Sequence, residues 1–330
     1  MSDGRYSIGV DLGGTYLKLA LLDGAGGIVA RETVPTGASE GHAAVLRRMA
    51  EGVRRLSGSV PEGEIDAVGV GVPGLVDMAS GVTEDLANLP GRWHGVAVGS
   101  DLAKATGLPV HLINDARAFV VAEHAMGAAA GAETALCVTV GTGIGGGLVA
   151  HGRVVFGLGG AAGEIGHLTV HAGGARCTCG NRGCVEPLAS GPGIVSEAIR
   201  RIVQGFTTEL TGLVGGDLNA MTPELVAQAA GAGDEVATEV LEEAGSYLGL
   251  ALAGAIATVA PEVVVLGGGV AQPGGIYWRA AEATARSHSH VTDIERIAFR
   301  PAALGYDAGV IGAALWGRQQ ARGEIGATAR

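Results

Sequence analysis

Residues 7 to 22 read SIGVDLGGTYLKLALL, and this stretch decides the fold. Ser7 to Asp11 is an apolar run that predicts a strand, followed by a two-glycine turn and a second strand over Leu17 to Leu22. The glycines let backbone N–H groups approach a phosphate closely, because no Cβ intervenes, and Asp11 can hold a hydrated magnesium ion. An ordinary glycine hairpin has the same pattern, so both interpretations stay open for this stretch alone.

A second copy of the pattern lies in the middle of the chain. VTVGTGIGGGLVAHGRVV at residues 138 to 155 aligns with VDLGGTYLKLALLDGAGGIV, with Gly141 over Gly13 and Thr142 over Gly14. An internal repeat of this kind predicts a duplicated domain. Binding a triphosphate from two sides requires two such glycine loops at equivalent positions. Neither loop is a Walker A motif, since no Gly-Lys-Ser/Thr follows, so the sequence argues against a P-loop fold.

Length and composition indicate a folded α/β enzyme. At 330 residues the chain favours two lobes, and with 47% hydrophobic but 4% aromatic residues its core is built from Ala, Val, Leu and Ile. The 59 glycines fall in short loops beside apolar strands. A net charge of -11 repels nucleic acid, so we expect no such partner.

No targeting or membrane segment is expected. The longest apolar stretch, Tyr247 to Ala260, is shorter than the roughly 20 residues that a bilayer span needs. The segment before the first strand leaves no room for a signal peptide or a DNA-binding head. The sequence therefore predicts a cytoplasmic protein without a membrane partner.

Further elements follow from periodicity and turn residues. The expected strands are Asp66 to Val72, Pro109 to Ile113 and Val263 to Leu266, and the expected helices run from Asn114-Asp115 to about Ala130, from Asp234 to Ala260 and from Asp307 to Arg322. Asp307 is suited to cap the last helix.

Asn114 and Asp115 stand at the carboxyl end of a predicted strand, where open α/β sheets place their ligands. Phosphoryl transfer to an alcohol needs an acceptor for the hydroxyl proton, and a carboxylate is the usual choice. A helix cap would use the same two residue types at a strand-to-helix junction. The residues alone do not separate these interpretations.

The sharpest local signal runs from Glu164 to Glu186, with EIGH and then CTCGNRGCVE. The spacing is His167-x9-Cys177-x-Cys179-x4-Cys184. One imidazole and three thiolates complete a tetrahedral zinc shell without room for water, so the predicted metal is structural. Three buried free thiols are the alternative, which the interleaved glycines disfavour. Glu164 and Glu186 bracket the loop and can accept hydrogen bonds from sugar hydroxyls, or they are solvated surface acids.

Together these motifs resemble the ROK family (repressor, open reading frame, kinase), a branch of the sugar kinase/actin-like ATPase superfamily. The matches, in chain order, are DLGGT at Asp11 to Thr15, GVPG at Gly71 to Gly74, NLPG at Asn88 to Gly91, NDARA at Asn114 to Ala118, GTGIGGG at Gly141 to Gly147, EIGH with CTCGNRGCVE, and VVLGGGV at Val264 to Val270. They cover nearly the whole chain.

The resemblance implies an α/β fold: a two-lobed actin-like ATPase, of duplicated ribonuclease H-like type, with a zinc-binding loop. It implies a small lobe of residues 1–114 plus 302–330. The large lobe would be residues 115–301, with the nucleotide-binding elements and the zinc loop.

The resemblance also assigns roles to single residues. Asp115 would be the catalytic base, and the sugar would contact Asn88, Asn114, Asp115, Glu164, His167 and Glu186. ATP would contact Asp11, Gly13, Gly14, Thr15, Thr142, Gly143, Gly268 and Gly269. The zinc ligands would be His167, Cys177, Cys179 and Cys184, and His167 would also face the sugar. Mg-ATP and a structural zinc ion are the implied cofactors.

The implied reaction is ATP-dependent phosphorylation of a hexose on its primary hydroxyl, with glucose as the leading substrate. Two departures affect the choice of sugar: Tyr16 stands where glucokinase-like members often carry lysine, with Lys18 two positions later, and Arg92 is inserted before Trp93. The alternatives are a kinase for an N-acyl hexosamine, fructose or a sugar-like cyclitol. A non-catalytic sugar-sensing regulator is the alternative of another class, and an actin-like structural ATPase would have no use for the zinc and sugar loops. We expect a homodimer or homotetramer.

Overall fold

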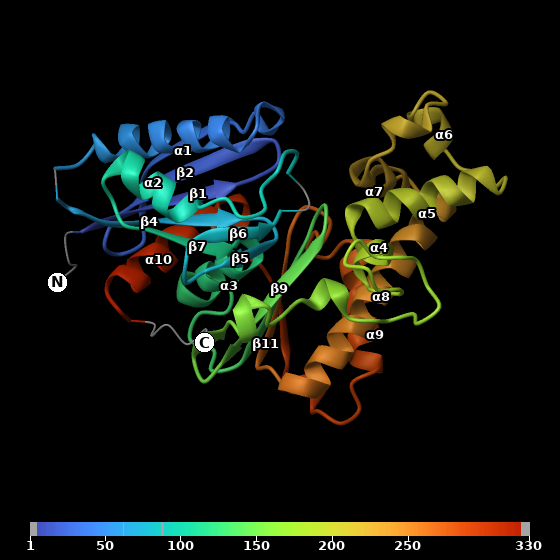
Figure 1. Ribbon diagram of the computed structural model, residues 1–330. Coiled ribbons are helices and arrows are strands. Elements are labelled where there is room, and N and C mark those ends of the chain that lie inside the picture. Colours follow the sequence, from blue (N-terminus) through green and yellow to red (C-terminus); the bar gives the residue numbers. More distant parts are fainter. Residues whose placement is uncertain (1–4, 62, 87–88, 325–330) are drawn as a thin grey trace. The chain divides into compact units, whose positions relative to one another are not determined.

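The computed structural model describes residues 5–61, 63–86 and 89–324, which form two compact units. The first unit comprises the described residues of 5–131, 154–162 and 304–324, and the second comprises 132–153 and 163–303 (Figure 1). These boundaries differ from the expected division after Asn114 and before Ala302. The helix that follows Asn114 belongs to the first unit because it packs against the last helix of the chain.

The first unit is a five-stranded sheet covered by helices on both faces. Its order is β3 (Ile28–Pro35), β2 (Tyr16–Leu22), β1 (Tyr6–Leu12), β4 (Ile65–Val72) and β7 (Val110–Asn114). The helices α1 (His42–Ser57) and α2 (Val98–Thr106) cover one face, and α3 (Asp115–Met126) and α10 (Ala308–Ala321) cover the other (Figure 1). A small hairpin, β5 (Leu75–Asp77) and β6 (Val82–Asp85), follows β4.

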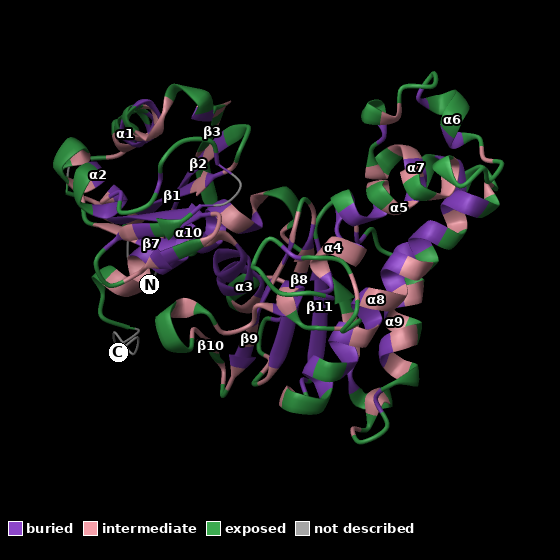
Figure 2. Ribbon diagram, turned by 45° about the vertical axis from the view of Figure 1, so that its right-hand side comes forward, coloured by how far each residue is buried: buried purple, intermediate pink, exposed green. Residues whose placement is uncertain are grey.

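The second unit is also built on a five-stranded sheet. Its order is β10 (Arg153–Val155), β9 (Ile144–Ala150), β8 (Ala135–Val140), β11 (Val263–Gly267) and β12 (Ala298–Pro301). Its helices are α4 (Glu186–Ala189), α5 (Gly191–Val203), α6 (Leu210–Leu213), α7 (Pro223–Gly231), α8 (Glu235–Val259) and α9 (Ile276–Ser287). The central strands of this sheet are buried (Figure 2).

The two sheets have the same topology, as the internal repeat predicts. In each, an antiparallel hairpin, β1–β2 or β8–β9, is followed by a parallel neighbour of its first strand, β4 or β11. The turns that close the two hairpins are residues 13–15 and 141–143. Gly13 and Gly141, which the sequence alignment pairs, therefore begin equivalent turns in two similar sheets.

The elements predicted from the sequence are present, with small shifts of their ends. Asp234 caps α8, because its carboxylate accepts the N–H of Ala237 at 2.8 Å. The expected cap at Asp307 is wrong: this residue precedes α10, but its side chain makes no capping bond and instead accepts from Arg31 at 3.2 Å. Asp307 ends the 3-10 turn Gly305–Asp307 with a helical backbone (φ -93°, ψ -7°), whereas a capping residue needs an extended one.

Helix α8 is long and apolar enough to cross a membrane by length and composition alone, and 61% of its most apolar window is buried inside the second unit. Its buried residues, among them Val240, Leu248 and Leu252, pack in one core with Tyr277 and Trp278 of α9. A core helix of a soluble protein explains this apolar length equally well.

Close contact between α10 and the first sheet depends on glycines outside the loops. A Cβ on Gly69 of β4 would overlap the carbonyl oxygen of Ala313, and one on Gly9 of β1 would overlap that of Val310. Glycine has no Cβ, so the helix backbone can rest directly on the strands. Glycine is expected in loops from the sequence, and no local pattern marks this packing role of strand glycines.

We expect Gly69→Ala to lower the free energy of unfolding by about 1–3 kcal/mol, because the added methyl group forces α10 away from the sheet. Chemical denaturation measures this. Gly71→Ala is the matched control: it lies on the same strand, and its Cβ would make ordinary contacts at 3.7–3.8 Å. Equal losses in the two variants would contradict the close-packing explanation.

Candidate functional site

The first glycine turn is held from behind by Thr36. The Thr36 N–H donates to the Thr15 carbonyl at 2.8 Å, and its hydroxyl donates to the Gly13 carbonyl at 2.6 Å. Thr36 is completely buried, whereas Gly14 and Thr15 are exposed. The turn therefore presents its backbone to solvent in a fixed conformation, which is what a phosphate-binding loop needs. Thr36 lies 21 to 23 residues from the turn, and no spacing rule in the sequence identifies it.

Asp11 at the end of β1 pairs with Lys18, its cross-strand neighbour on β2. The Lys18 Nζ lies 3.4 Å from Asp11 Oδ2 and 3.3 Å from the centre of the Tyr306 ring. Burial raises the pKa of the Asp11 carboxyl above its ordinary value, and Lys18 opposes this shift. Lys18 thus compensates the charge of Asp11. It lies two positions later than the lysine of glucokinase-like members.

Asn114 caps helix α3, which confirms the capping interpretation for this residue. Its side-chain oxygen accepts the Arg117 N–H at 3.2 Å, and its amide donates to the Gly74 carbonyl at 3.0 Å. Asp115 is the first residue of α3 and is half-buried, and its Oδ1 accepts the Ala116 N–H at 2.8 Å. The cap thus fixes the helix start from which the Asp115 carboxylate projects. The catalytic role of Asp115 stays a prediction.

The second glycine turn is braced by residues that follow the cysteine cluster. The Ile144 N–H donates to Glu186 Oε2 at 2.9 Å, and the Gly191 N–H donates to the Gly141 carbonyl at 2.9 Å. A Cβ on Gly143 would lie only 2.6 Å from Glu186 Oε2, which explains the glycine at this position. Thr142 at the tip of the turn is exposed.

The glycines after β11 lie against the start of the same turn. A Cβ on Gly268 would overlap the backbone of Val140, and the Val270 N–H donates to the Val140 carbonyl at 3.2 Å. Gly268 and Gly269 are exposed. The structure thus brings the expected phosphate loop at 141–143 and the expected adenosine motif together within the second unit.

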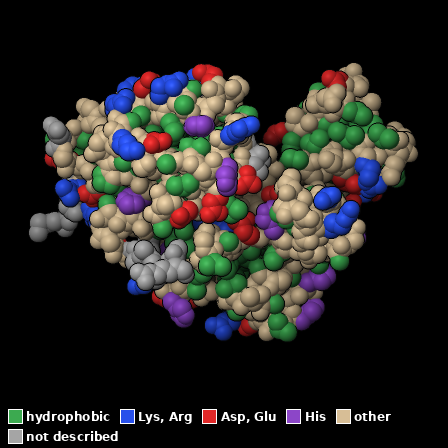
Figure 3. Space-filling model, viewed as in Figure 1, with side chains coloured by type: hydrophobic (Ala, Val, Ile, Leu, Met, Phe, Trp, Pro, Cys, Tyr) green, Lys and Arg blue, Asp and Glu red, His purple; other side chains and the backbone are tan. Residues whose placement is uncertain are grey.

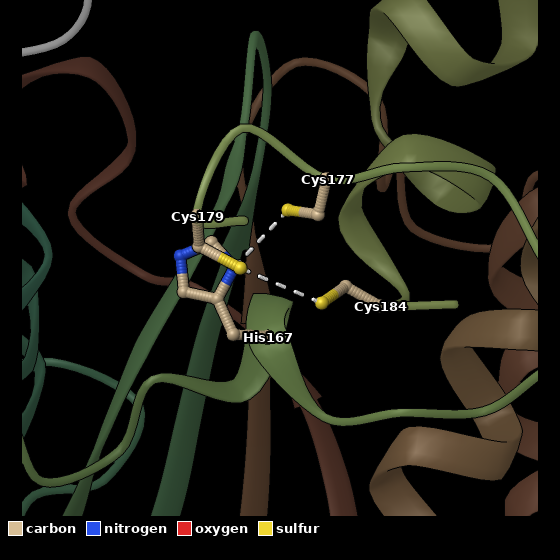
Figure 4. Close-up of side chains that lie close together, drawn as sticks. All are labelled: His167, Cys177, Cys179 and Cys184. Atoms are coloured by element: carbon tan, nitrogen blue, oxygen red, sulfur yellow. Dashed lines mark hydrogen bonds between the residues drawn. The ribbon is translucent and has the colours of Figure 1, made fainter. Parts of the chain in front are cut away.

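The four predicted metal ligands converge (Figure 4). Their ligand atoms all lie within 4.8 Å of one another; the residues are His167, Cys177, Cys179 and Cys184. The His167 Nδ1 lies 3.6 Å from Cys177 Sγ, and the Cys179 and Cys184 sulfurs are 3.8 Å apart. A tetrahedron with Zn–S bonds near 2.3 Å has sulfur–sulfur edges of about 3.8 Å. The donor set and its spacing fit a four-coordinate zinc ion.

The two ring nitrogens of His167 face different groups. Nδ1 points at the thiols, whereas Nε2 lies 3.8 Å from Glu164 Oε2. Burial raises the pKa of the Cys184 thiol to about 12, and a hydrogen bond from the Asn181 backbone lowers that of Cys179. A metal held here would bind Nδ1 and leave Nε2 directed at Glu164.

A pocket of about 350 Å³ lies beside this segment within the second unit. Glu164 and Ile165 line it on one side, and Leu250, Ala251 and Gly254 of α8 line it on the other. Its walls are mainly apolar, so it lacks the array of hydroxyl partners that a sugar requires. Glu164 lines this pocket, whereas His167 and Glu186 do not.

The remaining predicted residue, Asn88, lies outside the described residues. Nearby, the inserted Arg92 is exposed, whereas Trp93 is buried and its indole N–H donates to the Pro90 carbonyl at 3.2 Å. The insertion thus leaves the tryptophan in a core.

On the face shown in Figure 3, the described Lys and Arg side chains form small groups interspersed with acidic ones.

A model of the ROK family matches residues 7–320. This chain belongs to the ROK family. Its 37% identity to a glucokinase of Halalkalibacterium halodurans extends over 97% of each chain. A ROK hexokinase structure from Thermus thermophilus has a TM-score of 0.82 at 35% identity, covering 96% of this ROK chain and 99% of the other.

A second solved structure resembles this ROK chain to the same degree. It is a ROK family glucokinase from Streptomyces griseus in complex with glucose and AMPPNP, with a TM-score of 0.82 at 30% identity, covering 95% of this chain and 99% of that one. The α/β fold of the ROK kinases, expected from the motifs, is confirmed by these similarities.

The pairing of Asp11 with Lys18 predicts a pH-dependent loss of stability in Lys18→Met. We expect the variant to lose about 2 kcal/mol at pH 7, because a buried carboxylate is left without its partner. The pKa of Asp11 is already raised, and losing Lys18 raises it further. The folded variant therefore binds a proton more strongly than the unfolded chain, and its deficit shrinks as the pH falls towards 4.

Denaturation curves at several pH values measure this deficit. Lys104→Met is the matched control. The Lys104 side chain is 78% exposed, and its Nζ lies 3.7 Å from Asp101 Oδ1. Such a surface pair contributes little. A pH-independent deficit in Lys18→Met, or an equal one in the control, would contradict the account.

Proposed function

We propose that this chain is an ATP-dependent kinase that phosphorylates glucose on its primary hydroxyl, giving glucose 6-phosphate. The observation that carries the proposal is its similarity to a glucokinase over 97% of both chains, at 37% identity. The Streptomyces griseus relative, which binds glucose and AMPPNP, supports the choice of both substrates. Tyr16 and Arg92 depart from the glucokinase pattern, and these departures concern the choice of sugar.

The two glycine turns are the proposed phosphate contacts. Gly14 and Thr15 of the first turn would offer backbone N–H groups. The Gly13 N–H donates to the Tyr16 carbonyl at 3.1 Å, so Gly13 would only allow close approach. Thr142 and Gly143 would offer N–H groups from the second unit, where Gly268 and Gly269 would pack on the adenosine. Support comes from the exposure of both turn tips and from the bonds that hold each turn from behind.

Asp115 is the proposed catalytic base. Its carboxylate would accept the proton of the primary hydroxyl while the hydroxyl oxygen bonds to the γ-phosphorus. The bond from that phosphorus to the bridging oxygen breaks, and ADP leaves. Support comes from its position at the first residue of α3, which Asn114 caps.

Magnesium accompanies ATP, and Asp11 is the candidate residue to hold it through water, since a carboxylate oxygen is a hard ligand. When bound, the ion neutralises phosphate charge. Asp11 is the last residue but one of β1, close to the first glycine turn, and its carboxylate also pairs with Lys18. The proposed sugar contacts are those that the family resemblance implies: Asn88, Asn114, Asp115, Glu164, His167 and Glu186.

We further propose a structural zinc ion on His167, Cys177, Cys179 and Cys184. The spacing of the ligand atoms supports it. Binding at Nδ1 would fix the tautomer and orientation of His167, so the metal would act on the sugar through this ring. The cytoplasmic location and the homodimer or homotetramer stay predictions.

A sugar panel tests the proposed reaction. We expect ADP release with glucose to have the highest kcat/KM, measured by a coupled assay against an N-acyl hexosamine, fructose and a cyclitol. A higher kcat/KM with another sugar would change the proposed substrate but leave the chain a sugar kinase. Sugar binding by calorimetry without any ADP release would contradict the kinase and favour a sugar-sensing regulator.

Asp115→Asn tests the proposed base. We expect kcat on glucose to fall by about 10²–10⁴-fold, because the amide cannot accept the hydroxyl proton, while glucose still binds. Asp101→Asn on α2 is the matched control, since Asp101 is half exposed and lies outside the proposed site. Full turnover by Asp115→Asn would refute the mechanism.

Cys184→Ala tests the zinc site. We expect it to lose its bound zinc, to unfold at lower temperature and to raise the glucose KM by about 3–10-fold, because His167 is no longer held in place. Elemental analysis and steady-state kinetics on one preparation measure this. Cys137→Ala is the control, because that buried cysteine lies in β8, outside the cluster. Unchanged zinc content in Cys184→Ala would disprove the site.

A further inference from the structure

Glu186 makes a contact that the sugar-binding role does not use. Its Oε2 accepts the Ile144 N–H at 2.9 Å, and Ile144 directly follows the turn at 141–143. A carboxylate has two oxygens and can accept from both sides at once. One side chain can therefore hold the phosphate turn with one oxygen and a sugar hydroxyl with the other.

The backbone that carries Glu186 is fixed at both ends. Two residues before it stands Cys184, which is completely buried in the cysteine cluster. Three residues after it, the Ala189 carbonyl accepts the hydroxyl of the buried Tyr277 at 2.8 Å. The segment that carries Glu186 is thus anchored on both sides.

Ile144 is held on its other side by the segment that carries His167. Its carbonyl oxygen occupies the space where a side chain on Gly166 would begin, so the η3 turn (Ile165–His167) packs directly on it. Ile144 is 3% exposed and belongs to the core of the second unit. Both expected sugar-contacting segments of this unit therefore touch Ile144, the residue that directly follows the turn at 141–143.

We propose that Glu186 is a positioning residue that couples sugar binding to nucleotide binding through the Ile144 amide. A sugar hydroxyl on the second carboxylate oxygen would restrict rotation of the side chain and thereby order the turn at 141–143. The turn then loses its conformational entropy when the first ligand binds and does not lose it again when the second binds. The two ligands therefore bind cooperatively. This inference rests on the proposed function, because it takes Glu186 as a sugar contact.

The test is the ratio of two affinities, which a purely structural role would not move. Calorimetry on the full chain gives the Kd of AMPPNP without glucose and with saturating glucose. We expect glucose to tighten AMPPNP binding about tenfold in the unmodified chain, and AMPPNP to tighten glucose binding by the same factor.

Gly143→Ala interrupts the contact without changing Glu186. The added Cβ would lie 2.6 Å from Oε2 and push the carboxylate away from Ile144. Gly141→Ala is the matched control in the same turn, because its Cβ would have no atom within 4 Å. We expect the ratio to fall below about twofold in Gly143→Ala and to stay about tenfold in Gly141→Ala.

Glu186→Asp is the second variant, in case Gly143→Ala fails to fold. The shorter carboxylate cannot reach both partners, so we expect the same loss of coupling. A ratio that is unchanged in the folded variants, or is already near one in the unmodified chain, would overturn the coupling while glucose turnover continued. Absence of both glucose binding and turnover would instead reject the proposed function, and the coupling with it.

Discussion

A three-residue turn that presents its backbone to a ligand must be held by groups outside it. Both hairpin turns of this chain meet that constraint in the same way. Thr36 donates to the carbonyls of the first turn, whereas Glu186 and Gly191 bond the second from behind. Without such braces, glycine turns lose more conformational entropy on binding than other residues would. The conformations of the two glycine turns thus depend on bonds between distant parts of the sequence.

In the second unit, this constraint brings the cysteine cluster, Glu186 and the turn at 141–143 together. The chain passes from the cysteine cluster through Glu186 to α5, and Gly191 at the start of α5 bonds the turn. A metal ion at the cluster would therefore stabilise the phosphate turn as well as His167. In this view, a structural zinc ion acts on affinity and folding and takes no part in phosphoryl transfer.

The sequence predicted the central strands of both sheets, the long helix α8 and the ligand cluster, because each leaves a local signal. Apolar runs, caps and cysteine spacing all lie within a few residues of one another. The repeat at 138 to 155 also predicted the duplicated topology. These predicted features are present in the structure because local preference and tertiary packing agree.

The missed features depend on contacts that no local pattern contains. Gly69 and Gly9 look like ordinary strand residues, and only the position of α10 shows why a side chain is excluded. Thr36 has no motif, and the boundary after Gly131 follows from packing of α3 on α10. Asp307 looked like a cap, but Arg31, 276 residues away, takes its carboxylate.

The most direct test of the central claim is the position of the phosphate in the product. The purified chain with ATP and glucose should give an ester whose phosphorus couples to the two protons on carbon 6 in two-dimensional NMR. That result would identify transfer to the primary hydroxyl. Coupling to the anomeric proton, or no phosphate ester while ATP is hydrolysed, would contradict the account.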